Sequence, residues 1–144
     1  MLGFRDTLEV FFAVQVCDED SVFFLHTGRC YKILNEVTLS WSDARQKCKE
    51  IGRHGDLASI VDSGTQQFVI EHFNFTDRTW FGGHAKLASG DWRWIDGSEW
   101  LYQTWESSQP NEGGEAATFY GNSSYGFDWY DAALTYKFFS FCQY

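Results

Sequence analysis

The sequence has little proline, cysteine or positive charge. Of its 144 residues one is proline and four are cysteine, and 11 Lys and Arg side chains stand against 20 Asp and Glu side chains. The net charge of −9 would repel the phosphate backbone of a nucleic acid and an anionic membrane surface, so neither is an expected partner. No apolar run reaches the length of a bilayer-spanning helix, and membrane insertion is not expected.

Metal-binding cysteine motifs are also missing. None of the four cysteines sits in a CxxC pair, and the four histidines (His26, His54, His72 and His84) show no ligand spacing, so a zinc site is not favoured. An even number of widely spaced cysteines predicts two disulfides and an oxidising, extracellular location. Spacing alone leaves three pairings open.

Catalytic motifs are absent as well. The sequence contains no GxSxG elbow, no HExxH pair and no glycine-rich phosphate loop. Nothing in the order of Glu99, Glu106, Glu112 and Glu115 marks an acid and base pair of the kind that cleaves glycosides. We therefore do not expect an enzyme.

The length is that of a single domain, and aromatic residues make up 19% of it. The apolar run 8–16 predicts a first strand, with a truncated signal sequence as the alternative interpretation, so we divide the chain into an N-terminal extension, 1–16, and a domain, 17–144. Two glycosylation sequons begin at Asn74 and Asn122, which agrees with a secreted glycoprotein.

Hydrophobic periodicity and turn residues predict the remaining elements. Helices are expected from Ser40 to Gly52 and over 67–73, with capping boxes at Ser40 and at Ser63. The segment from Gly97 to Gly126 is rich in Gly, Ser and Asn and is expected to be irregular. The expected strands, including a hairpin between Cys17 and Cys30, are 22–25, 30–34, 56–61, 79–83, 90–96 and 138–142.

The only proline, Pro110, lies inside this long segment between Gln109 and Asn111. Glu115 follows four residues after Asn111, and Asp131 comes later. Amide and carboxylate oxygens are the hard ligands that calcium prefers, so these side chains predict a calcium site. The Gln109–Pro110 bond is a candidate cis peptide, because only X–Pro bonds adopt cis at low cost.

Several short motifs, in one order over Cys17 to Cys142, resemble the C-type lectin-like domain in its long form, and soluble invertebrate lectins in particular. The resemblance implies an α+β fold with two helices, two small antiparallel sheets and a long loop region. The matching motifs are Cys30-Tyr31, Trp41-Ser42-Asp43-Ala44, Leu57-Ala58-Ser59-Ile60, Trp80-Phe81-Gly82-Gly83, Trp94-Ile95-Asp96-Gly97, Gln109-Pro110-Asn111, Trp129-Tyr130-Asp131 and Phe139-Ser140-Phe141-Cys142.

The resemblance also implies the disulfide pairing, Cys17–Cys30 and Cys48–Cys142. A further bridge, common under the binding loops of the family, has Ala117 and Leu134 at its two positions here. Because both cysteines are replaced together, no lone thiol is left, and a covalent dimer is not expected although an oligomer is possible. Apolar packing could fill the space of the missing bridge.

Carried over from the family's sugar-binding members, the ligands of Ca²⁺ become Gln109, Asn111, Glu115 and Asp131, and the same four residues would contact the sugar. Tyr130 stands where the family has an asparagine ligand. With two formal charges among the ligands, we expect weak calcium affinity, on the order of 10⁻⁴–10⁻³ M. The family's auxiliary calcium positions fall on Ala85, Ser89 and Glu112, and we expect no second site there.

Gln-Pro-Asn matches neither the family's mannose-type Glu-Pro-Asn nor its galactose-type Gln-Pro-Asp, so glycans of either type are candidate partners. Trp100 is the candidate ring for stacking on the sugar, whereas Trp105 is expected in the core. The leading interpretation is a secreted calcium-dependent lectin. The alternative is a lectin-like domain that binds a protein or another surface without calcium, which Tyr130 and the missing bridge favour.

Overall fold

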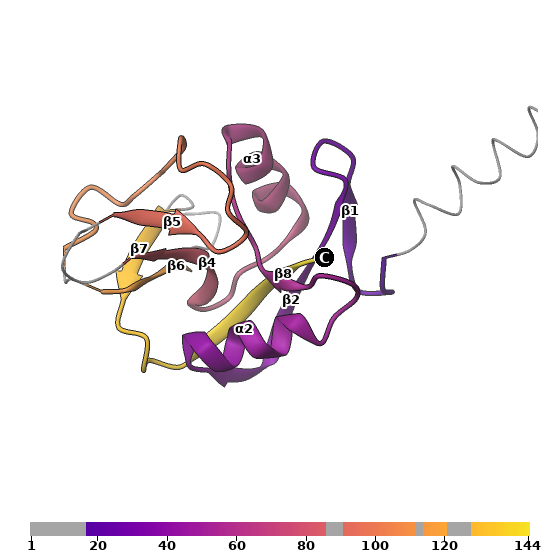
Figure 1. Ribbon diagram of the computed structural model, residues 1–144, viewed down its shortest axis with the longest axis horizontal. Coiled ribbons are helices and arrows are strands. Elements are labelled where there is room, and N and C mark those ends of the chain that lie inside the picture. Colours follow the sequence, from indigo (N-terminus) through magenta and orange to yellow (C-terminus); the bar gives the residue numbers. More distant parts are fainter. Residues whose placement is uncertain (1–16, 86–90, 112–113, 121–127) are drawn as a thin grey trace, which may run out of the picture.

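The computed structural model describes residues 17–85, 91–111, 114–120 and 128–144 as a mixed sheet flanked by two helices (Figure 1). The strand expected over 8–16 therefore lies outside the described residues. The strands are β1 (Val22–Phe24), β2 (Arg29–Leu39), β3 (Asp56–Leu57), β4 (Thr79–Ala85), β5 (Trp92–Trp94), β6 (Ala116–Tyr120), β7 (Asp128–Ala132) and β8 (Phe138–Gln143).

The main path of the sheet runs β1-β2-β8-β4-β6-β7, with β3 on β8 and β5 on β4. Among these described strands, every pairing is antiparallel except the one between β4 and β8. That parallel pairing, through Thr79 with Phe139 and Trp80 with Ser140, joins the two antiparallel sheets expected from the sequence into one. The α+β class and its two helices are confirmed.

Both faces of the central strands are buried. On β4, Trp80 belongs to the core cluster that contains Ala44 and Cys48 of helix α2 (Trp41–Lys49), whereas Phe81 belongs to the cluster that contains Phe68 of helix α3 (Ser63–His72). Successive strand residues point to opposite faces, so each helix covers its own side of the sheet. Figure 1 shows α2 and α3 on either side of β8 and β2.

The two helices begin at side-chain caps. Ser40 caps α2, and its Oγ accepts a hydrogen bond from the Asp43 amide at 3.4 Å, as expected. The cap of α3 is Asp62 and not Ser63: its Oδ1 accepts from the amide and the hydroxyl of Thr65, both at 2.7 Å. An N-cap carboxylate satisfies first-turn N–H groups more strongly than a hydroxyl, so the helix starts earlier than expected.

Several strand boundaries differ from the expected ones. The expectation that 97–126 is irregular was wrong for β6, which pairs with both β4 and β7. The expected strand 56–61 is reduced to two residues, and β2 extends to Leu39. Strand β6 is short and rich in alanine, and its neighbours on the sheet, not its own composition, make it a strand.

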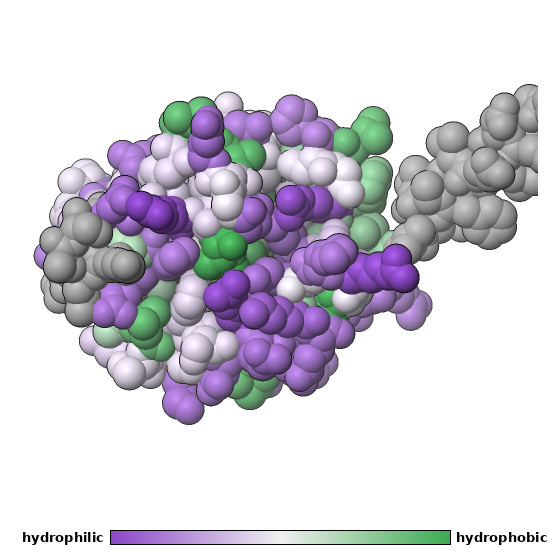
Figure 2. All heavy atoms as spheres, viewed as in Figure 1, coloured by the Kyte–Doolittle hydropathy of each residue, from purple (hydrophilic) through white to green (hydrophobic). Residues whose placement is uncertain are grey.

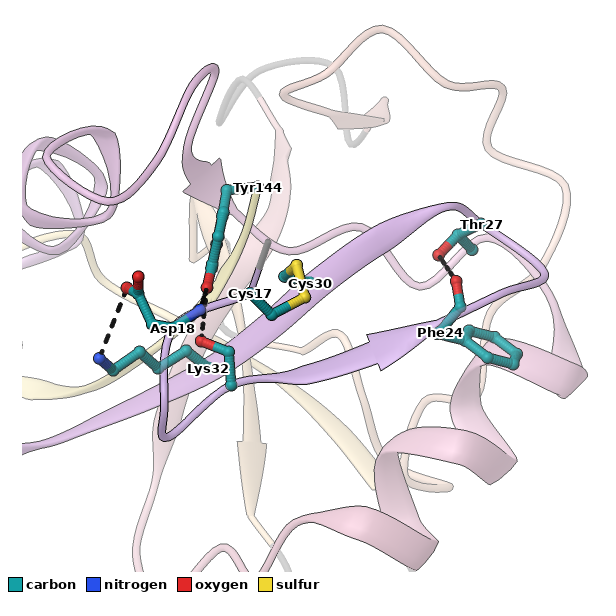
Figure 3. The surroundings of a disulfide bond; sticks show 8 residues. Cys17, Asp18, Phe24, Thr27, Cys30, Lys32 and Tyr144 are labelled. Atoms are coloured by element: carbon teal, nitrogen blue, oxygen red, sulfur yellow. Dashed lines mark hydrogen bonds and ion pairs between the residues drawn. A yellow bond between two sulfur atoms is a disulfide. The ribbon is translucent and has the colours of Figure 1, made fainter. Parts of the chain in front are cut away.

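Both expected disulfides are present, Cys17–Cys30 and Cys48–Cys142. The first ties the start of the described chain to β2 beside the C-terminal residue (Figure 3). There the Tyr144 hydroxyl accepts a hydrogen bond from the Asp18 amide at 2.6 Å and donates one to Ser21 Oγ at 2.7 Å. The two ends of the domain are therefore held together by covalent and polar contacts.

No helix in the described ranges has both the length and the apolar character that crossing a membrane requires. The face of the molecule shown in Figure 2 is mostly polar, with apolar residues scattered over it, in keeping with the net charge of −9.

Candidate calcium and sugar site

An open pocket of about 400 Å³ lies at the end of the sheet that β7 forms. It includes three of the four calcium ligands expected from the sequence. Its described lining consists of Arg78, Gln109, Asn111, Gly114, Tyr130, Asp131, Ala132, Ala133 and Tyr136. The residues come from three separate segments of the chain, at position 78 and over 109–114 and 130–136, which the pairing of β6 with β7 and of β4 with β6 brings together.

Asp131 is the residue that holds the loop to the sheet. Its carboxylate accepts hydrogen bonds from the amides of Asn111 at 3.2 Å and Gly114 at 2.8 Å, and its own amide donates to Gln109 Oε1 at 3.3 Å. The residue is 6% exposed. A buried carboxylate that accepts hydrogen bonds from backbone N–H groups is well satisfied, so Asp131 joins Asn111 and Gly114 to strand β7.

Hydrogen bonds in the residues just before Pro110 hold the loop that leads into the pocket in a turn. The Gln109–Pro110 peptide bond is cis, as expected. The Gln109 amide donates to the Glu106 carbonyl at 2.8 Å, which closes a turn. Hydrogen bonds from the hydroxyls of Ser108 and Ser107 and from the Ser108 amide hold the pKa of Glu106 below its usual value. The Glu106 carboxylate thus organises the turn from outside the pocket lining.

The donor set suits calcium. Asp131 offers a carboxylate, and Gln109 and Asn111 offer amide oxygens, all of which are hard ligands. Within the described residues no three His, Cys, Asp or Glu side chains gather in a group that could hold a metal. From the described wall of this pocket, a calcium ion would therefore draw on the Asp131 carboxylate and on the amide oxygens of Gln109 and Asn111.

Glu115 is not part of the pocket lining. It follows Gly114, is half-buried, and its carbonyl accepts a hydrogen bond from the Ala85 amide at 2.9 Å. The structure thus places Glu115 next to a lining residue without bringing it into the wall. Of the auxiliary positions, Ala85 lies on β4, whereas Ser89 and Glu112 lie outside the described residues.

Trp100 lies away from this pocket, in a cluster of tryptophans. Its ring stacks on Trp94 with centroids 4.4 Å apart, and its Nε1 donates to Gln103 Oε1 at 3.0 Å. The same oxygen accepts from Trp105 Nε1 at 3.2 Å, and Trp105 is half-buried against the buried ring of Trp129. The aromatic rings that do line the pocket are those of Tyr130 and Tyr136.

The positions of the missing bridge are filled by apolar packing. Ala117 is fully buried in the core cluster that contains Phe68 of α3, and Leu134 packs against the core cluster that contains Cys48 of α2. The Leu134 carbonyl also accepts a hydrogen bond from the Trp41 amide at 3.1 Å.

Sequence reasoning missed the lining residues Arg78 and Tyr136, whose side chains can contact a ligand, and also the small residues Gly114, Ala132 and Ala133. Arg78 precedes β4, and its guanidinium carbon lies 5.4 Å from the centre of the Tyr130 ring and 5.7 Å from that of Phe138. Tyr136 is 56% exposed. No local pattern in the sequence marks either residue. Arg78 reaches the pocket through the long-range pairing of β4 with β8, and Tyr136 through the turn after β7, where its amide donates to the Ala133 carbonyl at 3.1 Å.

Disulfides that tie the ends together, two helices on a mixed sheet, and a polar loop pocket define a binding domain of the C-type lectin class. The family model for the lectin C-type domain matches residues 37–144. The chain therefore belongs to the lectin C-type domain family, whose members bind ligands and are not enzymes.

Two curated relatives illustrate the range of the family. One chain of a snaclec coagulation factor IX/factor X-binding protein from Echis carinatus is 36% identical over 98 residues, which are 60% of this chain and 72% of that protein. The galactose-specific lectin nattectin from Thalassophryne nattereri is 32% identical over 91 residues, 60% of this chain and 55% of that protein. Matches to three further relatives span 60%, 66% and 58% of their lengths.

Among solved structures, the C-type lectin domain of murine dendritic cell inhibitory receptor 2, crystallised with an N-glycan, superposes with a TM-score of 0.78 at 25% identity. The superposition covers 89% of this chain and 98% of that one. Human lithostathine gives a TM-score of 0.77, also at 25% identity, over 89% of this chain and 90% of that one.

Proposed function

We propose that this protein is a secreted lectin that binds a sugar of the galactose or mannose type through Ca²⁺ at the Gln109–Asp131 pocket. The observation that carries the proposal is the hydrogen-bonded joining of Gln109, Asn111 and Asp131 at one open pocket. Bound there, calcium supplies coordination positions that two neighbouring sugar hydroxyls can fill in place of water. The N-glycan complex of the murine receptor domain and the galactose specificity of nattectin support the same kind of ligand.

The residues have separate tasks in this proposal. Asp131 contributes the negative charge, and Gln109 and Asn111 contribute amide oxygens that can also accept hydrogen bonds from sugar hydroxyls. Glu115 is retained as the fourth ligand, because its neighbour Gly114 already lines the pocket. The two intrachain disulfides agree with an extracellular protein.

A glycan array, run with calcium and again with a chelator, tests the proposal, and calorimetry gives the calcium affinity. We expect Asp131→Ala and Asn111→Ala to lower calcium affinity about tenfold or more, and Glu115→Ala to do the same if its side chain reaches the ion. Asn35→Ala, a change at an exposed asparagine of β2, is the matched control and should have no effect. No heat of calcium binding together with no calcium-dependent glycan would refute the proposal.

Tyr130 favours a second candidate, the binding of a protein or another surface without calcium. Its phenol stands where the resemblance implies an amide ligand, and the snaclec relative is named for binding coagulation factors. In that case Asn111→Ala and Asp131→Ala would leave partner binding intact in the presence of chelator. Loss of all binding in both variants would exclude this candidate.

A further inference from the structure

Arg78 lines the Gln109–Asp131 pocket, and its backbone is held by hydrogen bonds. Its amide donates to Asp77 Oδ1 at 2.7 Å, and its carbonyl accepts from the Phe139 amide at 3.2 Å. The backbone from which the side chain projects is therefore held between the start of β4 and β8. The side chain is half-buried and forms part of the pocket wall.

Two aromatic rings position the guanidinium. Its central carbon lies 5.4 Å from the centre of the Tyr130 ring and 5.7 Å from that of Phe138, within the range of a cation–π contact. A guanidinium that stacks on a ring keeps its N–H donors in its own plane. Donors arranged in one plane match the geometry of a planar carboxylate and can also bond to a sulfate.

The charges in the pocket favour an anion beside Arg78. Among the described residues that line it, Arg78 and Asp131 carry the formal charges. The Asp131 carboxylate already accepts hydrogen bonds from the amides of Asn111 and Gly114. If calcium binds with Asp131 and Glu115 as ligands, its two positive charges offset the two carboxylates, and the charge of Arg78 leaves the site net positive, in a chain whose overall charge is −9.

We propose that Arg78 makes this pocket select acidic sugars, which carry a carboxylate or a sulfate ester next to the ring hydroxyls. The hydroxyls would face Gln109 and Asn111, and the anionic group would face the guanidinium. The inference rests on the proposed function, because it assigns the class of sugar to the same pocket. The carboxylate and the sulfate ester both present negatively charged oxygens, and the experiment distinguishes sugars that carry one from sugars that carry the other.

The test compares matched sugars by calorimetry in saturating calcium. Galactose is compared with galacturonic acid and with galactose 6-sulfate, and mannose with mannuronic acid. We expect the wild type to bind at least one acidic sugar about tenfold or more tightly than its neutral counterpart, the size expected for a charge-assisted hydrogen bond. In Arg78→Gln the ratio of acidic to neutral affinity should fall to about one.

Arg78→Lys separates charge from geometry. It should keep part of the preference for the sulfate and lose more of the preference for the carboxylate, because lysine cannot form the planar paired contact. The matched control is Arg93→Gln on β5, an exposed arginine 2.9 Å from Asp91 and outside the pocket lining, which should leave the ratio unchanged.

A salt titration of the wild type provides a test that depends on no variant. The preference for the acidic sugar should weaken between about 50 mM and 500 mM sodium chloride, because salt screens an exposed charge pair. Two results would overturn this inference and leave the proposed function standing. One is that the wild type binds neutral and acidic sugars with equal affinity, and the other is that Arg78→Gln loses affinity equally for both. No sugar binding of any kind would overturn both.

Discussion

Tyr130 is the residue at which this pocket departs most from the family pattern that it resembles. Its phenol lines the pocket beside Asp131, and its ring lies under the Arg78 guanidinium. A phenol is a poorer calcium ligand than an amide oxygen, so the residue lowers the number of protein ligands. In exchange it provides a flat apolar surface that can pack against a guanidinium or a sugar.

Tyr130→Asn should therefore raise calcium affinity, by about tenfold, because an amide oxygen joins the ligand set. Calorimetric titration with calcium chloride measures the change. Tyr136→Asn is the control, since Tyr136 lines the same pocket at a position that the family does not use for a ligand. Unchanged or weaker affinity in Tyr130→Asn would mean that this position does not face the ion.

A second single residue, His84, makes the stability of the fold depend on pH. Burial lowers the pKa of His84 below its usual 6.5, and the positive charges of Arg45 and Arg93 lower it further. The unfolded chain therefore binds a proton at His84 more readily than the folded chain. The stability that neutral His84 provides is complete above about pH 6.5 and is lost as the pH falls through the folded-state pKa.

We expect His84→Gln to flatten this part of the pH profile. Urea unfolding at several pH values between about 7.5 and 5 measures the slope of the free energy of unfolding against pH. Reversibility of the unfolding transition at each pH is the control for this comparison. Equal slopes for His84→Gln and the wild type would show that His84 titrates alike in both states.

At the scale of elements, strand β4 lies very close to the segment that follows β3. The Gly82 amide donates to the Ala58 carbonyl at 2.7 Å, and a Cβ on Gly82 would lie 2.9 Å from the carbonyl oxygens of both Ala58 and Leu57. Backbone oxygens cannot rotate out of the way as a flexible side chain can. A glycine is therefore required here by space and not by its backbone angles.

Gly82→Ala should destabilise the domain by about 1–3 kcal/mol, the usual cost of overpacking. Gly64→Ala is the matched control, because the nearest atom to its added Cβ is Asp62 Oδ1 at 3.6 Å and alanine favours the helix by up to about 1 kcal/mol. Urea unfolding of both variants gives the comparison. The prediction fails if Gly82→Ala is as stable as the wild type.

The elements differ in how well the sequence alone predicts them. Helix α2 and strand β8 carry strong local signals, namely a cap with a helical stripe and a run of aromatic residues, and both are found where expected. Strand β6 has alanines and a polar neighbourhood that resembles a loop, so its pairing partners decide its conformation. At Ser63 the local capping pattern was present, but the Asp62 carboxylate competes more effectively.

At the scale of the whole molecule, two disulfides close loops of very different length. Cys48 of α2 and Cys142 of β8 are 94 residues apart, whereas Cys17 and Cys30 are 13 apart. A crosslink stabilises mainly by reducing the entropy of the unfolded chain, and the effect grows with the length of the loop. The long bridge also lies in the core, with both cysteines fully buried.

Replacing Cys48 and Cys142 together by alanine should lower the free energy of unfolding by about 4–5 kcal/mol, against about 3 kcal/mol for the Cys17 and Cys30 pair. Denaturant unfolding of the two double variants measures the difference, with the fully oxidised wild type as reference. A larger loss for the short loop would contradict this account.

The sequence by itself determined the first helix cap and the position of the loop around Pro110. Through the resemblance of its motifs, it also determined the α+β class and the pairing of the two disulfides. These depend on residues that are close in the chain or on motifs in a fixed order. Only the tertiary structure decided that Arg78 shares a pocket with Gln109 and Asp131, while Trp100 lies elsewhere among the tryptophans. The reason is that lateral strand pairing, β4 with β8 and β6 with β7, joins distant segments, and no local periodicity specifies which strands become neighbours.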